Sequence, residues 1–355
     1  MKTCVIGTGN GGQAIAAWLS SQGNTVSLYG RNSDTISALS SRGSIQLIGA
    51  VTGVGPLSEV TTNIHKSVSG AELIMVVTTA NGHGSIAEQI AGDLTNNQII
   101  ILNPGRTGGA LEFQRALEAN GCKARVYVAE AQSLVYACRL VENGIVNIIG
   151  VKDKVLLSAA PASDTSFVLE KISTIYRCFC AAENVLQTSL ENIGAIFHPC
   201  VLLFNAATIE RNDVFWFYRD MTPEIANFIE EFDRERLAVG KAYGIDLLSV
   251  NEWISYAYPD TKGTTLCEKM RSNPAYYNIK SPSSLYTRQL TEDIPTGVLP
   301  IMELGEVAGV DVSLLRSMVD ICSRLLRKDF RKEGRTLKRL GLDGLSKDDI
   351  IKRLS

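Results

Sequence analysis

In the first half of the chain, short apolar runs alternate with segments in which hydrophobic residues recur every three or four positions. The first apolar run ends in a glycine-rich segment, and helical spacing then begins at Ile15. Further strands are expected at residues 25–29, 44–48, 71–77, 98–102 and 124–128, and a helix at 85–94. Strands that alternate with helices form parallel sheets, so the pattern predicts an α/β Rossmann-type domain with a doubly wound, mostly parallel sheet.

The character of the chain changes near its middle. Residues 145–149 and 154–157 are expected to form a last hairpin or pair of strands, and residues 185–188 a final strand. Beyond them the apolar residues keep helical spacing almost to the end. We therefore expect a dinucleotide-binding Rossmann-like domain at 1–188, followed by an all-α substrate and catalytic domain at 189–355.

Two helices of the second half have clear start signals. Thr222 and Pro223 predict an N-cap and a first helical residue for a helix that reaches about Tyr243. Ser313 lies at the start of another helix, in which one face is expected to be apolar. That face comprises Leu314, Leu315, Met318, Ile321 and Leu325.

Composition and charge narrow the function classes. The 355 residues are 45% hydrophobic and carry a net charge of -2, with no long basic run, which argues against nucleic acid as a partner. The eight cysteines have no paired CxxC spacing, so a reduced, cytoplasmic protein without a metal site is expected. We expect no signal peptide, because the first residues run straight into a strand pattern, and no membrane partner, because no apolar stretch is long enough to span a bilayer. Oligomeric state stays open, and a homodimer is one possibility.

The glycine-rich segment has the spacing of a dinucleotide fingerprint. It sits between a predicted strand and a predicted helix and reads Gly7-Thr8-Gly9-Asn10-Gly11-Gly12. In this context Gly7 permits a tight turn, Gly9 lets the backbone approach a pyrophosphate, and Gly12 lets the helix pack on the strand. The pyrophosphate would lie at the positive end of the helix that begins near Asn10. The alternative is an ordinary glycine turn.

The end of the second predicted strand bears on the choice of cofactor. NAD enzymes usually place an acidic residue there, but this chain has Gly30 followed by Arg31. A guanidinium can bind the 2′-phosphate of NADP through two hydrogen bonds, so NADP is preferred and NAD is the alternative. Arg31 could instead stack on the adenine or remain solvated.

Three polar loops follow predicted strands and are expected to face the cofactor, at residues 78–83, 103–109 and 130–139. Thr79 in the first of them is a candidate cofactor contact. His83 is expected to be a solvated loop residue, although it could touch the nicotinamide ribose. Arg106 and Arg139 could bind carboxylates or be surface charges.

Candidate catalytic residues lie in the second half. His198 could exchange a proton near pH 7, provided that a carboxylate holds its other ring nitrogen. Asp293 is the candidate for that carboxylate and Glu292 is its rival, while Arg288 could anchor a substrate carboxylate. The structural alternatives are a packed histidine at a helix kink before Pro199, and two acidic residues that cap a helix.

Several short segments, spread in order along most of the chain, can be considered together. Besides the fingerprint, they are Asn103-Pro104-Gly105 with Gly108-Gly109, residues 130–139, residues 192–199, Phe217-Tyr218 with Thr222-Pro223, Glu235-Arg236, and residues 291–295. In this order, and with a helical C-terminal half, they resemble the octopine/nopaline (opine) dehydrogenase family.

This resemblance implies an NAD(P)H-dependent reductive condensation of an amino acid with a 2-oxo acid such as pyruvate. The product would be a secondary-amine dicarboxylate, and the reverse oxidation is also implied. By the same resemblance, His198 is the catalytic histidine, Asp293 its carboxylate partner, and Arg288 the arginine that binds a substrate carboxylate. Tyr136 and Gln132 would lie in the loop that faces the active site and bind substrate.

Two other functions are compatible with such a sequence. One is an NADP-dependent ketoacid reductase that resembles the ketopantoate or glycerol-3-phosphate enzymes. Those families use a lysine at the start of the second domain, where this chain has Glu191-Asn192 and then His198. The other is a non-catalytic NADP-binding sensor, because a fold does not imply activity. The sequence does not name the amino acid or the 2-oxo acid.

Overall fold

The computed structural model describes residues 1–354, which form two compact units. The first unit comprises Met1–Thr188 together with Leu354, and the second comprises Ser189–Arg353. The first has a mostly parallel sheet and the second is helical, which confirms the predicted fold class.

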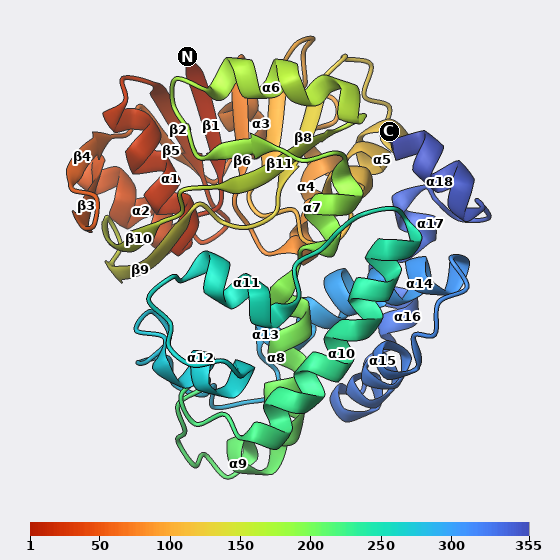
Figure 1. Ribbon diagram of the computed structural model, residues 1–355. Helices are drawn as coiled ribbons and strands as arrows, with labels where there is room; N and C mark the ends of the chain where they lie inside the picture. Colours follow the sequence, from red (N-terminus) through yellow and green to blue (C-terminus); the bar gives the residue numbers. More distant parts are fainter. Residues whose placement is uncertain (355) are drawn as a thin grey trace. The chain divides into compact units, whose positions relative to one another are not determined.

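The main sheet of the first unit has eight strands in the order β12-β11-β8-β7-β6-β1-β2-β5 (Figure 1). They are β1 (Lys2–Ile6), β2 (Thr25–Tyr29), β5 (Glu59–Thr61), β6 (Leu73–Val76), β7 (Ile99–Leu102), β8 (Tyr127–Ala131), β11 (Val155–Ala160) and β12 (Phe179–Ala181). Neighbouring strands are parallel except β8 and β11. The order runs outward from β1 in both directions, and such sheets bind ligands at the carboxyl ends of their strands.

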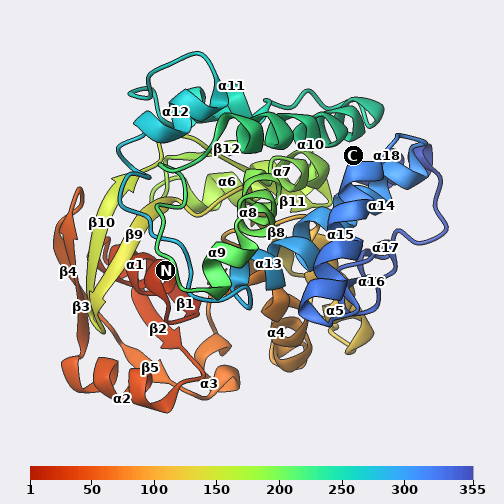
Figure 2. The ribbon, with the colours of Figure 1, turned by 90° about the horizontal axis from the view of Figure 1, so that it is seen from below.

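A second sheet has four strands in the order β4-β3-β10-β9, and Figure 2 shows it beside α1 (Asn10–Ser21). Its strands are β3 (Ser44–Gly49), β4 (Gly53–Pro56), β9 (Tyr136–Glu142) and β10 (Ile145–Val151). Because α1 contacts strands of both sheets, Ala14, Ala16 and Ala17 are all fully buried. The contact with β4 is so close that a Cβ on Gly55 would lie 2.4 Å from the Ala17 carbonyl oxygen.

Further helices connect the strands of the first unit, except α7, which follows the last strand and extends past Thr188. They are α2 (Ser33–Arg42), α3 (Ile64–Val68), α4 (His83–Ile90), α5 (Gly109–Ala119), α6 (Thr165–Ile172) and α7 (Val185–Leu190), with 3₁₀ turns at Ala80–Gly82 and Ala162–Asp164. The predicted strand at 185–188 is wrong, since these residues belong to α7 and the last strand is β12. The two strands predicted at 145–149 and 154–157 are confirmed as parts of β10 and β11, but they do not form a hairpin, because they belong to different sheets. Short apolar runs do not by themselves specify helix or strand, or a strand's partner.

The second unit consists of helices around the long α10 (Pro223–Ala242). The others are α8 (Ile193–Phe204), α9 (Ala206–Glu210), α11 (Val250–Ala257), α12 (Leu266–Ser272), α13 (Arg288–Thr291), a π-helical turn (Ile294–Val298), α14 (Leu299–Val307), α15 (Ser313–Leu326), α16 (Phe330–Glu333), α17 (Leu337–Leu340) and α18 (Lys347–Leu354). The predicted start of α10 is confirmed, because Thr222 Oγ1 accepts a hydrogen bond from the Ile225 amide at 3.3 Å.

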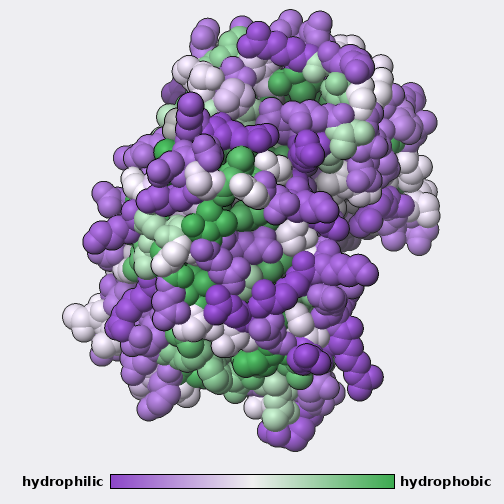
Figure 3. Space-filling model, turned by 90° about the vertical axis from the view of Figure 1, so that its right-hand side faces the viewer, coloured by the Kyte–Doolittle hydropathy of each residue, from purple (hydrophilic) through white to green (hydrophobic). Residues whose placement is uncertain are grey.

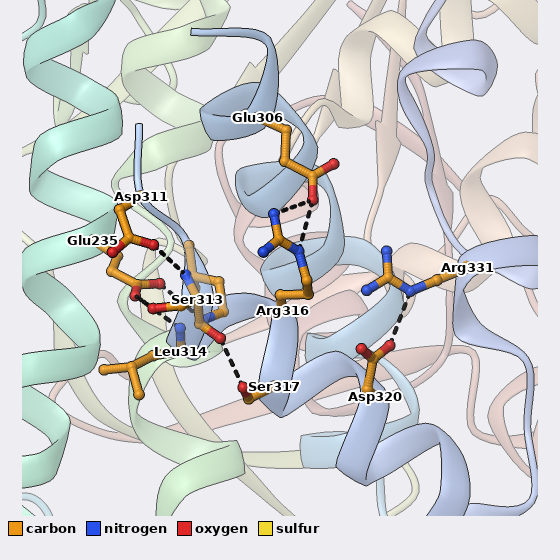
Figure 4. A network of polar contacts seen from close by, with 10 residues as sticks. Glu235, Glu306, Asp311, Ser313, Leu314, Arg316, Ser317, Asp320 and Arg331 are labelled. Carbon is orange, nitrogen blue, oxygen red and sulfur yellow. Dashed lines mark hydrogen bonds and ion pairs between the residues drawn. The ribbon is translucent and has the colours of Figure 1, made fainter. Parts of the chain in front are cut away.

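A carboxylate from α10 holds the N-terminus of α15 (Figure 4). Glu235 accepts hydrogen bonds from the amides of Leu314 and Leu315, each at 2.8 Å. These amides have no partner within the helix, and the negative charge also suits the positive end of the helix dipole. The predicted apolar face is only partly right, because Ile321 and Leu325 of α15 are exposed.

A buried ion pair lies inside the second unit. The fully buried Arg236 donates to Asp233 Oδ1 at 2.6 Å and to the carbonyl oxygens of Leu190 at 2.9 Å and Leu248 at 2.7 Å. The other Asp233 oxygen accepts from the Val250 amide at 2.7 Å. The pair therefore connects α10 to the segment that leads into α8 and to the start of α11.

Hydrophilic side chains cover most of the face in Figure 3, and hydrophobic ones gather in limited patches. Among the described helices, none combines the length and apolar character that a bilayer crossing requires.

Replacing Arg236 with Met should lower the free energy of unfolding by about 3–5 kcal/mol, because Asp233 would stay buried without its cation. Urea unfolding followed by circular dichroism measures this change. The matched variant Arg234→Met removes an exposed arginine of the same helix and should cost less than about 1 kcal/mol. Equal losses in the two variants would contradict a special role for the buried pair.

Candidate functional site

His198 and Asp293 are in contact in the second unit. His198 lies on α8 and Asp293 directly precedes the π-helical turn, and the distance from His198 Nδ1 to Asp293 Oδ2 is 2.6 Å. The Asp293 side chain is 2% exposed, whereas that of His198 is 17% exposed. A buried carboxylate beside a partly accessible imidazole fixes the ring and favours a proton on Nδ1.

The backbone near this pair allows α8 and the π-helical turn to approach each other closely. A Cβ on Gly297, in the π-helical turn, would lie 2.5 Å from the Cβ of Ala195 on α8. Only glycine therefore fits where the two helical segments meet. π-Helical turns are rare and often occur at functional sites. Pro199 also lacks the amide that would bond to the Ala195 carbonyl oxygen, which weakens α8 next to His198.

The other ring nitrogen of His198 contacts Tyr218, which the sequence analysis did not select as a site residue. The distance from His198 Nε2 to the Tyr218 hydroxyl is 3.0 Å. The Tyr218 ring stacks on Tyr276, with centroids 4.4 Å apart, and packs edge-on against Phe217. With Nδ1–H donating to Asp293, Nε2 accepts from the Tyr218 hydroxyl and remains the nitrogen that can exchange a proton.

The two neighbouring carboxylates have different partners. Asp293 contacts His198, whereas Glu292 pairs with Arg288 at 3.5 Å. The Glu292 side chain is 3% exposed and that of Arg288 is 60% exposed. Arg288 is therefore anchored by Glu292, one turn along α13, and retains an accessible guanidinium.

The fingerprint glycines have distinct steric roles. Gly7 has φ +124°, and a Cβ there would lie 2.3 Å from the Val77 carbonyl oxygen. A Cβ on Gly12 would lie 1.9 Å from the Gly7 carbonyl oxygen, whereas one on Gly9 would meet no atom within 4 Å. The N-terminus of α1 has no side-chain cap and no acidic residue in its first turn. Open space at Gly9 beside uncapped amides fits a pyrophosphate.

The remaining candidate cofactor residues differ in their surroundings. Arg31 is exposed and forms no hydrogen bond or ion pair with any described side chain. Thr79 is exposed at the start of a 3₁₀ turn. The Asn10 side chain instead accepts a hydrogen bond from the Leu140 amide at 2.9 Å, so it fixes β9. A Cβ on Gly30 would lie 2.5 Å from Thr8, so Gly30 makes room for that side chain.

Two expectations about the loops need correction, those for Tyr136 and His83. Tyr136 does not lie in a loop: it begins β9, is 6% exposed and belongs to the hydrophobic core, where burial raises its pKa. Gln132 lies in the loop after β8, as expected, and its side chain accepts a hydrogen bond from the Leu156 amide at 3.4 Å; substrate binding by Gln132 stays a prediction. His83, the first residue of α4, is fully buried rather than solvated. Sequence alone does not show which residues of a polar segment a sheet will cover.

Known proteins resemble both halves of the chain. Residues 181–326 match the family described as NAD/NADP octopine/nopaline dehydrogenase, alpha-helical domain. Residues 2–109 match the NAD-dependent glycerol-3-phosphate dehydrogenase N-terminus. An opine dehydrogenase from Arthrobacter sp. (strain 1C) is 38% identical over 344 residues, which cover 96% of this chain and 95% of the relative.

Solved structures share the fold. Octopine dehydrogenase with NADH and L-arginine superposes with a TM-score of 0.83 at 19% identity, covering 99% of this chain and 98% of that one. NADP⁺-bound yersinopine dehydrogenase gives a TM-score of 0.75 at 13% identity, covering 100% and 97%. Together with the relative that is 38% identical over nearly the whole chain, these similarities show that the protein belongs to the opine dehydrogenase family of NAD(P)-dependent oxidoreductases.

Proposed function

We propose that this opine dehydrogenase uses His198 as its acid–base group and NADPH as its preferred reductant. The observation that carries the proposal is the 2.6 Å contact between His198 and the buried Asp293, which leaves Nε2 as the nitrogen available for proton transfer. Neither a ketoacid reductase with a catalytic lysine nor a cofactor sensor requires this pair. The substrates are an amino acid and a 2-oxo acid, for which pyruvate is the first candidate.

In the forward reaction, the amine adds to the carbonyl carbon of the oxo acid and water is then lost to give an imine. His198 takes up at Nε2 the proton that the adding amine releases, and then returns it to the hydroxyl that departs as water. Asp293 stabilises the imidazolium that forms when the ring takes up a proton. The bound dinucleotide supplies the hydride that reduces the imine. Tyr218 is a positioning residue that holds the imidazole ring from the side opposite Asp293.

Arg288 is proposed to bind a carboxylate of the oxo acid. Its guanidinium is held by the buried Glu292 and is 60% exposed, so it can donate two parallel hydrogen bonds to a ligand. Fixing the oxo acid in this way orients its carbonyl for reaction.

The proposed preference for NADPH is based on Arg31. Its exposed guanidinium follows β2, at the position where NAD enzymes usually place an acidic residue for the ribose 2′-hydroxyl. A cation here favours a phosphate over a hydroxyl.

NADPH oxidation by the wild-type enzyme should require an oxo acid and an amino acid together. His198→Gln should lower that rate by about 10²–10⁴-fold because the acid–base group is lost, while NADPH affinity stays within about twofold. His65→Gln is a matched control, since His65 also pairs with an aspartate, Asp93 at 2.7 Å, but is 61% exposed in the first unit. Oxidation with an oxo acid alone would contradict the proposed condensation, and loss of NADPH binding in His198→Gln would make His198 structural.

Removing the Tyr218 hydroxyl should reduce turnover without affecting substrate binding. Tyr218→Phe deletes one hydrogen bond, worth about 0.5–1.5 kcal/mol, so kcat should fall roughly 2- to 12-fold with KM values unchanged. Steady-state kinetics on this variant and on Tyr277→Phe, an exposed tyrosine elsewhere in the unit, give the comparison. If both variants keep the wild-type kcat, Tyr218 does not position the imidazole.

Arg31→Ala should weaken NADPH binding by roughly 10- to 100-fold, the worth of a charge-assisted hydrogen bond, and barely change NADH binding. Fluorescence titration of both reduced cofactors measures the two affinities. An equal effect on both would refute recognition of the 2′-phosphate.

A further inference from the structure

Two cationic residues of the first unit lie on segments far apart in the sequence, and the charge of one of them, Arg106, lowers the pKa of the other, Lys152. Arg106 lies in the loop after β7, and Lys152 lies in the turn before β11. The loop of Arg106 is tied to the end of β8 by a hydrogen bond from the Gly105 amide to the Ala131 carbonyl oxygen at 3.0 Å. Arg106 has φ +61°, a left-handed conformation that residues other than glycine adopt rarely and often at functional sites.

Lys152 is tied to the segment that follows β8. Its amide donates to the Val135 carbonyl oxygen at 3.0 Å, and its ammonium donates to Ser133 Oγ at 2.7 Å. Within residues 1–354 this hydroxyl is the one hydrogen-bonding side chain that the Lys152 ammonium contacts, and no carboxylate pairs with it. Burial, together with the charge of Arg106, lowers the pKa of Lys152 to about 8.

An ammonium that is partly buried beside another cation destabilises the unliganded protein. The buried Arg236 of the second unit shows the usual arrangement, since Asp233 neutralises it. Lys152 lacks such a partner, which points to a negative charge supplied from outside the chain.

We propose that Lys152, Ser133 and Arg106 form a binding site for the anionic oxygens of a small molecule. Lys152 and Arg106 supply the positive charge. Ser133 accepts the Lys152 hydrogen bond through its oxygen and directs its own hydroxyl hydrogen to the ligand.

The surroundings of Ser133 point to two kinds of anionic group. The next residue, Leu134, lies over the fingerprint: its Cδ2 is 2.9 Å from where a Cβ on Gly11 would be. The anion is therefore either the diphosphate of the dinucleotide or a carboxylate of the opine or its precursors. The carboxylate source rests on the proposed function, whereas the diphosphate source requires only cofactor binding.

Lys152→Met removes the charge and keeps most of the length of the side chain. NADP⁺ and ADP-ribose affinities are measured by calorimetry, the pyruvate KM by steady-state kinetics, and the melting temperature without ligand. Either both nucleotide affinities should weaken by about 10- to 100-fold, or the pyruvate KM should rise by a similar factor. The unliganded variant should also melt at a higher temperature, since a destabilising charge is gone.

Lys154→Met, an exposed lysine in the same turn, is the matched control and should change none of these quantities. Ser133→Ala, which keeps both cations, should weaken the binding of the same ligand by a smaller factor. Weaker nucleotide binding identifies the diphosphate, and a raised pyruvate KM identifies the carboxylate. Unchanged affinities and KM in Lys152→Met would overturn the proposal. The nucleotide titrations need no turnover, so an inactive preparation would count against the proposed function alone.

Discussion

The second unit depends on one buried guanidinium. Arg236 has no contact with solvent, and its three hydrogen bonds reach α10 itself, the segment before α8, and the segment before α11. A charge in such a place is tolerable only when every donor has a good acceptor, so the three segments must hold their positions together. The segment that leads into α8, the helix that carries His198, is held in place by this requirement.

The pair of His198 and Asp293 shows how much of the candidate site could be predicted from side-chain chemistry alone. The need of a catalytic imidazole for a carboxylate selected Asp293, and the structure has the two side chains in contact although 95 positions separate them. Glu292 could not be excluded from the sequence, because both residues are acidic and the sequence does not tell which of the two side chains points toward His198. Tyr218 was missed for a related reason: it lies in an irregular segment, where no periodicity tells which way a side chain points.

The first unit was predictable where local rules dominate. A fingerprint at a strand–helix junction depends on backbone clearance, and the glycines at positions 7 and 12 have the close contacts that such a turn requires. Secondary structure and burial were predicted wrongly where contacts between segments distant in sequence determine them. Tyr136 is a core residue because a second sheet forms from strands that are distant in sequence, and residues 185–188 are helical although their short apolar run also suits a strand.

The reversal of one strand has a consequence for the ligand-binding edge of the main sheet. β11 runs antiparallel to β8, and its register pairs Leu157 with Ala131, the last residue of β8. The amino end of β11 therefore emerges where the parallel strands present their carboxyl ends. The turn of Lys152 reaches that edge without a crossover helix to carry it there. An added antiparallel strand thus gives a doubly wound fold one more loop at its ligand-binding edge. The residues of this loop can change, and with them the ligands that bind, while the central strands stay the same.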